Sequence, residues 1–165
     1  LDEPLGALDR PLHDRLVTEL GELFAAIAQT AVYVTHDVAE AFALGAKVAV
    51  MREGRIVQVA PPEELWARPA DSWVARFVGL ANVTENGATA VVVRPEGVRF
   101  RSDPRGDAVV GEARRDGALV TLSARYDDGR EIVSAETGLL LPESGTRVAV
   151  EIDPAAVVEI PASAS

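Results

Sequence analysis

Two different hydrophobic periodicities divide this chain of 165 residues. Over residues 1–79, apolar residues recur at helical spacing in some stretches and form short β-branched runs in others. From about residue 88 onward, short strand-like runs alternate with turn residues such as Asp116-Gly117. We therefore predict an α/β domain, a linker, a small all-β barrel and a disordered tail, over residues 1–79, 80–87, 88–160 and 161–165 respectively.

The first part predicts strands and helices in alternation. Residues 10–28 carry leucines at helical spacing, with Asp9 in the N-cap position and Pro11 in the first turn. Residues 30–35 are typical of a buried strand in a parallel sheet. Strand, helix and strand in this order predict a right-handed crossover. The remaining expected elements are helices over 38–44, 61–66 and 71–78 and a hairpin of strands over 47–51 and 55–59.

The second part predicts a sheet that closes on itself. Six short candidate strands occupy it, and closure into a barrel would remove their exposed edges. The expected strands span residues 88–93, 98–101, 108–114, 119–126, 131–135 and 147–152.

Composition excludes several classes of function. The net charge is −10 and the sequence pI is about 4.6, so we expect no nucleic-acid partner and no binding to anionic lipid. The chain has no cysteine, which excludes a disulfide framework and a thiolate metal site. No apolar run approaches the roughly 20 residues that span a bilayer, so we expect a cytoplasmic chain without direct membrane insertion.

Acidic residues and a histidine follow two of the expected strands. Asp2 and Glu3 stand at the end of the first strand, where an α/β sheet binds ligands, and His36 ends the next one. Phosphoryl transfer needs a metal cation and a group that orients the attacking water. Asp2 is suited to binding magnesium, Glu3 to accepting a proton, and His36 to contacting a terminal phosphate. An ordinary acidic turn and a surface histidine are the alternative interpretation.

The order and spacing of these residues resemble the ABC transporter ATPase family, which has a P-loop NTPase-type fold. Leu1-Asp2-Glu3-Pro4 resembles the end of the Walker B motif, Leu5-Gly6-Ala7-Leu8-Asp9 the D-loop, and Val34-Thr35-His36-Asp37 the switch-histidine segment. Five further segments also match importer ATPases: residues 38–41, 48–56, 61–66, 68–70 and 74–79. The resemblance implies ATP and Mg²⁺ as cofactors.

The resemblance also implies a role for each matching residue. Asp2 would hold the metal, Glu3 would be the general base, and His36 would contact the γ-phosphate. Asp9 would lie in the loop that touches the opposite subunit. The implied partners are a second ATPase subunit and the permease subunits of the transporter, which would place the chain at the inner face of the cell membrane.

The second part resembles the accessory domain called TOBE, a small OB-like barrel appended to many importer ATPases. The segment Val93-Arg94-Pro95-Glu96-Gly97-Val98-Arg99 carries this resemblance. Such domains pair subunits, bind regulators or bind small oxyanions. A generic small barrel with a surface pair between Arg94 and Glu96 is the alternative interpretation.

The sequence departs from the family pattern in one important respect. It contains no Gly-x-x-x-x-Gly-Lys-Ser/Thr run, and its single lysine, Lys47, lies in an expected strand. The family's glutamine loop and signature motif are also absent. Our leading hypothesis is the carboxyl-terminal portion of the ATP-hydrolysing subunit of an ABC importer, inactive as an isolated chain.

Two further expectations follow from that hypothesis. The alternative function is a non-catalytic dimerisation, regulatory or oxyanion-binding module. We also expect self-association, because apolar faces of the first part would lack neighbouring strands.

Overall fold

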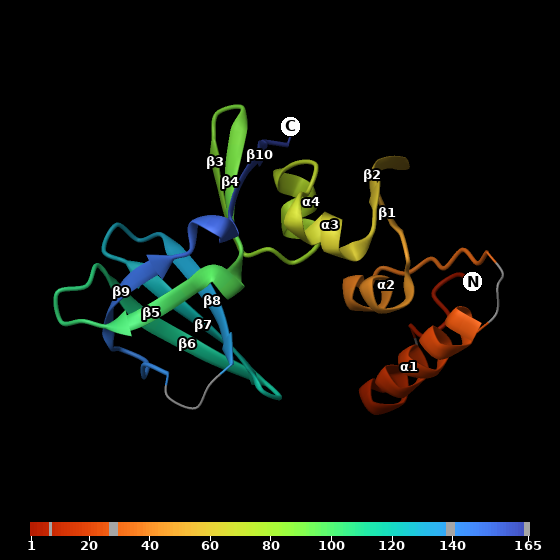
Figure 1. Cartoon of the computed structure of the whole chain (residues 1–165), viewed down its shortest axis with the longest axis horizontal. Coiled ribbons are helices and arrows are strands. Elements are labelled where there is room, and N and C mark those ends of the chain that lie inside the picture. The colour runs from red at the N-terminus through yellow and green to blue at the C-terminus, as the bar shows by residue number, and fades with distance from the viewer. Residues whose placement is uncertain (7, 27–29, 138–140, 164–165) are drawn as a thin grey trace. The chain divides into compact units, whose positions relative to one another are not determined.

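The computed structural model describes residues 1–6, 8–26, 30–137 and 141–163. It is a mixed α/β structure that divides into two compact units, Leu1–Ala67 and Arg68–Ser165, called here the first and second unit (Figure 1). In the described part of the chain, no helix has the length and apolar character needed to cross a membrane.

Two helices organise the start of the first unit. Helix α1 spans Arg10–Ala26 and helix α2 spans Val38–Leu44, and the two are in contact. The cap predicted for α1 is confirmed, because Asp9 Oδ1 accepts a hydrogen bond from the Leu12 amide at 3.0 Å. Asp37 caps α2. The prediction for α1 is confirmed to residue 26, and residues 27–28 lie outside the described residues.

Helix α1 is only partly covered. None of its described residues is fully buried, and the Leu12 and Leu23 side chains are 42% and 49% exposed. The expected self-association stays a prediction.

The prediction of a buried strand over residues 30–35 is wrong. Val32 is 74% exposed and Val34 is 50% exposed, and only an isolated parallel bridge between Asp2 and Val34 is formed. Three backbone hydrogen bonds of 2.9–3.0 Å join this segment to Leu1 and Glu3. A parallel strand becomes buried when strands flank it and helices cover both faces, and here residues 1–3 provide one short neighbour.

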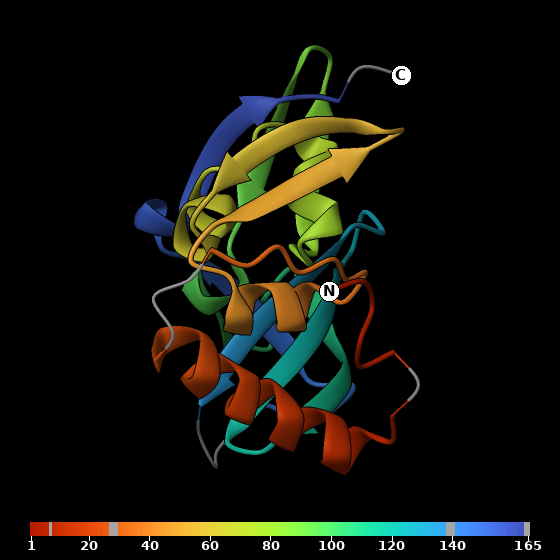
Figure 2. The same ribbon diagram turned by 90° about the vertical axis from the view of Figure 1, so that its right-hand side faces the viewer.

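The hairpin predicted after α2 is confirmed. Strands β1 (Val48–Arg52) and β2 (Arg55–Ala60) pair in antiparallel fashion, as Figure 2 shows. Glu53 and Gly54 have φ angles of 52° and 75°, so both turn residues take the left-handed conformation of a tight hairpin turn. The predicted short helix follows as α3 (Pro62–Ala67), in which Leu65 is fully buried.

The second unit begins with helix α4 (Ser72–Phe77), where a helix was predicted over residues 71–78, and Asp71 caps it. A three-stranded antiparallel sheet follows in the order β10-β4-β3, with β4 (Thr89–Val93) in the centre. The linker expected over 80–87 is wrong, because β3 (Asn82–Asn86) forms an edge of this sheet. Val83 alone is apolar in that strand, so its composition is that of a loop.

The prediction of a disordered tail over residues 161–165 is wrong for residues 161–163, which the structure describes. Strand β10 spans Val157–Pro161 and pairs with β4. Beyond it, the Ala162 amide donates to the Ala88 carbonyl and the Ser163 amide to Ser72 Oγ, each at 2.9 Å. Residues 164–165 lie outside the described residues.

A five-stranded antiparallel sheet forms the rest of the second unit, in the order β5-β9-β6-β7-β8. Its strands are β5 (Val98–Ser102), β6 (Ala108–Asp116), β7 (Leu119–Tyr126), β8 (Glu131–Thr137) and β9 (Arg147–Ile152). Short 3-10 turns, Pro95–Gly97 and Pro154–Ala156, precede β5 and β10. The β5 and β8 ends of the order do not pair through backbone hydrogen bonds in the described chain, and closure into an OB-like barrel stays a prediction.

One cluster of apolar side chains forms the hydrophobic core of the five-stranded sheet. Val98, Phe100, Ala108, Val110, Val120, Leu122, Ala124, Ile132 and Val148 are all at least 93% buried in it. Asn82 connects the two sheets, because its side chain donates to the Val93 and Val133 carbonyls and accepts from the Val133 amide at 2.7 Å. The second unit therefore has a core of its own.

Candidate functional site

The structure brings together Glu3 and His36, which are 33 residues apart in the chain. His36 Nδ1 lies 2.8 Å from Glu3 Oε1, and both side chains are more than half exposed to solvent. The position of His36 follows from the bridge between residues 1–3 and the segment before it, in which the Glu3 amide donates to the Val34 carbonyl. The hydrogen bond with the Glu3 carboxylate, aided by its charge, raises the pKa of His36.

A small hollow of about 140 Å³ lies beside this pair. Its walls combine two histidines and three carboxylates with apolar and hydroxyl groups: Glu3, Leu5, Gly6, Leu8, His13, Thr35, His36, Asp37 and Glu40. The described lining does not include Asp2 or Asp9. The hollow is of the size of one phosphate group and too small for a whole nucleotide.

Asp2 and Asp9 stand apart from this pair. Asp2 is exposed and lies next to Glu3 at the bridge to Val34. Asp9 uses its carboxylate to cap α1, and its backbone carbonyl accepts from the His13 amide at 2.9 Å. The metal role of Asp2 and the interface role of Asp9 remain predictions.

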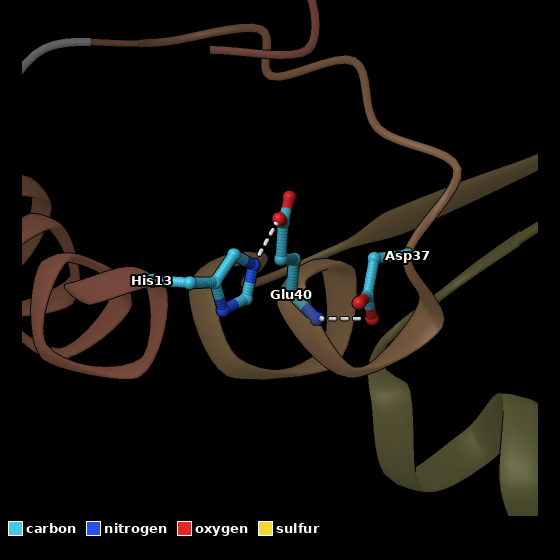
Figure 3. Close-up of side chains that lie close together, drawn as sticks. All are labelled: His13, Asp37 and Glu40. Atoms are coloured by element: carbon cyan, nitrogen blue, oxygen red, sulfur yellow. Dashed lines mark hydrogen bonds and ion pairs between the residues drawn. The ribbon is translucent and has the colours of Figure 1, made fainter. Parts of the chain in front are cut away.

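The sequence motifs did not indicate the buried carboxylate in the wall of the hollow. Glu40, on α2, is only 5% exposed, and its Oε1 lies 2.5 Å from His13 Nε2 on α1 (Figure 3). The Tyr33 hydroxyl donates to Glu40 Oε2 at 3.0 Å, and the Thr35 hydroxyl also donates to this carboxylate. The available signal was His13 itself, which shares one face of α1 with apolar Val17.

These contacts favour the charged form of the carboxylate. Burial raises the pKa of Glu40, but hydrogen bonds from Thr35, His13 and Tyr33 outweigh that effect and lower the pKa overall. Burial, together with the bond to Glu40, raises the pKa of Tyr33 to about 12. Hydrogen bonds with Glu40 and Asp14 raise the pKa of His13.

His13, Asp37 and Glu40 also form a group of potential metal ligands. One donor atom of each lies within 4.8 Å of the others. However, Asp37 Oδ1 already accepts from the Ala39 and Glu40 amides at 2.7 and 3.2 Å, and both Glu40 oxygens accept hydrogen bonds. Helix capping and the Glu40 network therefore account for this group, and we assign no metal to it.

The His13–Glu40 pair predicts a pH-dependent stability. Because the pKa of His13 is raised in the folded state, its stabilising effect is complete below pH 6.5, the ordinary histidine pKa. The effect is lost as the pH rises through the higher folded-state value. We expect the difference in melting temperature between the unaltered chain and His13→Gln to be largest near pH 5.5 and to shrink by pH 8.5. Thermal unfolding followed by circular dichroism measures it.

His36→Gln is the matched control for that measurement, since the chain has only two histidines. His36 and Glu3 form an exposed pair, which solvent screens, so this variant should show a smaller pH-dependent difference. A constant difference between unaltered chain and His13→Gln across the pH range would contradict the assignment.

The chain is similar in sequence to proteins of known family. No protein-family model matches the chain. The Fe(3+) ions import ATP-binding protein of Streptomyces coelicolor is 41% identical over 181 residues, which cover 96% of this chain and 52% of the relative. The corresponding protein of Streptomyces avermitilis is 40% identical over 182 residues, covering 96% and 53%. This chain is homologous to ABC importer ATP-binding subunits.

A third relative is named for a solute other than Fe(3+). The spermidine/putrescine import ATP-binding protein of Bacillus thuringiensis is 43% identical over 102 residues, covering 62% of this chain and 31% of the relative. The chain spans about half the length of the two Streptomyces proteins that it matches. The resemblance drawn from the residue pattern is confirmed at the level of the family.

Proposed function

We propose that this chain supplies the catalytic carboxylate and the switch histidine of an ATP-hydrolysing ABC importer subunit. The contact between Glu3 Oε1 and His36 Nδ1 carries this proposal, because a carboxylate and an imidazole meet beside a hollow of phosphate size. The relatives are named as import ATP-binding proteins, which supports the proposal.

Each residue of the site has one task in this proposal. Glu3 accepts the proton of the attacking water, and its hydrogen bond with His36 orients both side chains. In its protonated form, which Glu3 favours by raising its pKa, His36 donates from Nδ1 to Glu3 and from Nε2 to the γ-phosphate. Bound Mg²⁺ would neutralise charge on the phosphate oxygens, and Asp2 is the carboxylate that would hold it.

The remaining parts of the proposal concern partners and location. Asp9, at the start of α1, faces the second ATPase subunit, and the subunit pair couples ATP hydrolysis to solute uptake through permease subunits. The chain then acts at the cytoplasmic face of the membrane. We also propose that the isolated 165 residues do not hydrolyse ATP, because they contain no P-loop sequence to hold the phosphates.

A chimera tests the proposal directly. This chain would replace the aligned part of the Streptomyces coelicolor relative, and phosphate release from Mg-ATP would be measured. We expect the chimera to hydrolyse ATP and Glu3→Gln to lower its kcat by about 100-fold or more, since general-base catalysis contributes that much. The isolated chain should release no phosphate.

Glu19→Gln provides the matched control, because within the described residues Glu19 makes only an exposed ion pair with Arg15 on α1. This variant should retain the activity of the unaltered chimera. An active chimera whose turnover survives Glu3→Gln would overturn the catalytic assignment.

A further inference from the structure

The hollow beside the proposed catalytic pair is also lined by a buried charge. Glu40 is the only charged side chain among the buried residues of the described chain. A carboxylate buried in this way is tolerated only when hydrogen bonds replace its lost hydration. Glu40 meets that condition through three side-chain partners, and none of them comes from its own helix.

The partners come from two segments that each carry a proposed site residue. His13 belongs to the first turn of α1, where its amide donates to the carbonyl of Asp9. Tyr33 and Thr35 belong to the segment that ends at His36. One carboxylate therefore connects the start of α1 to the strand-like segment that carries the histidine.

Further hydrogen bonds connect Tyr33 and Thr35 to the catalytic pair. Val34, between the two hydroxyl residues, donates its amide to the Leu1 carbonyl and accepts from the Glu3 amide, each at 2.9 Å. The Thr35 hydroxyl also accepts from the Asp37 amide at 3.0 Å. The hydrogen bonds of Tyr33 and Thr35 with Glu40 thus fix the backbone on both sides of Val34. Because Val34 is bonded to residues 1 and 3, they also fix the distance between Glu3 and His36.

We propose that Glu40 is a positioning residue that sets the contact between His36 and Glu3 and links it to α1. This inference rests on the proposed function for its catalytic meaning. Glu40 acts through Tyr33 and Thr35 and itself bonds neither Glu3 nor His36. Loss of its hydrogen bonds should release His36 from Glu3 while the fold persists.

The pKa of His36, measured by NMR in the unaltered chain and its variants, is the test. The chain has two histidines, so His13→Gln and His36→Gln assign both ring signals. The charged groups that act on His36 are Glu3, Asp37 and Glu40. Glu40→Gln would remove one of these charges. The decisive variants are therefore Tyr33→Phe and Thr35→Val, which keep Glu40 charged and bonded to His13 but remove its hydrogen bonds to the segment that carries His36.

We expect the double variant Tyr33→Phe/Thr35→Val to lose most of the elevation of the His36 pKa. Glu3→Gln gives the His36 pKa after complete loss of the contact. Thr18→Val is the matched control for Thr35→Val, because it removes a hydroxyl on α1 that donates to the Asp14 carbonyl. An unchanged His36 pKa in a folded double variant, with a lowered one in Glu3→Gln, would overturn the proposal. If the double variant unfolds, Tyr33→Phe alone decides by the same criterion.

This readout requires no nucleotide. An inactive chimera with a lowered His36 pKa in the double variant would count against the proposed function and support the positioning role. An active chimera with an unchanged His36 pKa would do the opposite.

Discussion

Replacing Leu122 by alanine is expected to lower the free energy of unfolding of the second unit by about 2–5 kcal/mol. Leu122 is 1% exposed and lies on β7, the strand that pairs with both β6 and β8. Its neighbours across these two ladders are the small residues Ala113 and Ser134, which cannot fill the space that the leucine leaves. The substitution therefore removes apolar contacts and creates a cavity in the core.

Urea unfolding followed by circular dichroism measures this loss. Leu119→Ala is the matched control, because it makes the same chemical change on the same strand at a side chain that is 45% exposed. The control should lose less than about 1 kcal/mol. Equal losses in the two variants would show that Leu122 does not pack in the core described above.

Replacing Gly106 by alanine is expected to destabilise the second unit by about 1–3 kcal/mol or more. A Cβ atom at this position would lie 2.1 Å from the Val148 carbonyl oxygen and 2.6 Å from the Ala149 nitrogen. Both are backbone atoms of β9, so the strand itself or the turn before β6 must move. The Gly106 amide and carbonyl are bonded to Asp103 and Arg147, and that movement would disturb both bonds.

Gly111→Ala is the control for the glycine effect. A Cβ there would lie 2.9 Å from Ser123 Oγ, the end of a side chain that can rotate away. Thermal unfolding should therefore show a much smaller drop in melting temperature for Gly111→Ala than for Gly106→Ala. The reverse order would contradict the close approach of the 103–107 turn to β9.

Local patterns in the sequence were sufficient where an element depends on its own residues. The hairpin around Glu53-Gly54 and the Asp9 cap of helix α1 were predicted because turn and capping preferences act over a few residues. The six strands predicted in the second part were found for the same reason, with small shifts of their ends.

Elements that depend on distant partners were predicted poorly. Strand β3 has almost no apolar residue, and it is a strand because β4 supplies its hydrogen bonds. Residues 30–35 show the opposite case, since a strongly strand-like sequence has one short neighbour and stays largely exposed. Neither outcome is encoded in a hydrophobic pattern, which reports burial only when the rest of the sheet is known.

For the candidate site, the sequence by itself determined the residue types, their order and the family, through Asp2, Glu3, Asp9 and His36. Only the tertiary structure decided that Glu3 and His36 share a hydrogen bond and that Glu40 lies buried between His13, Tyr33 and Thr35. The physical reason is that motifs are read along the chain, whereas a buried carboxylate is stabilised by whichever donors folding brings to it.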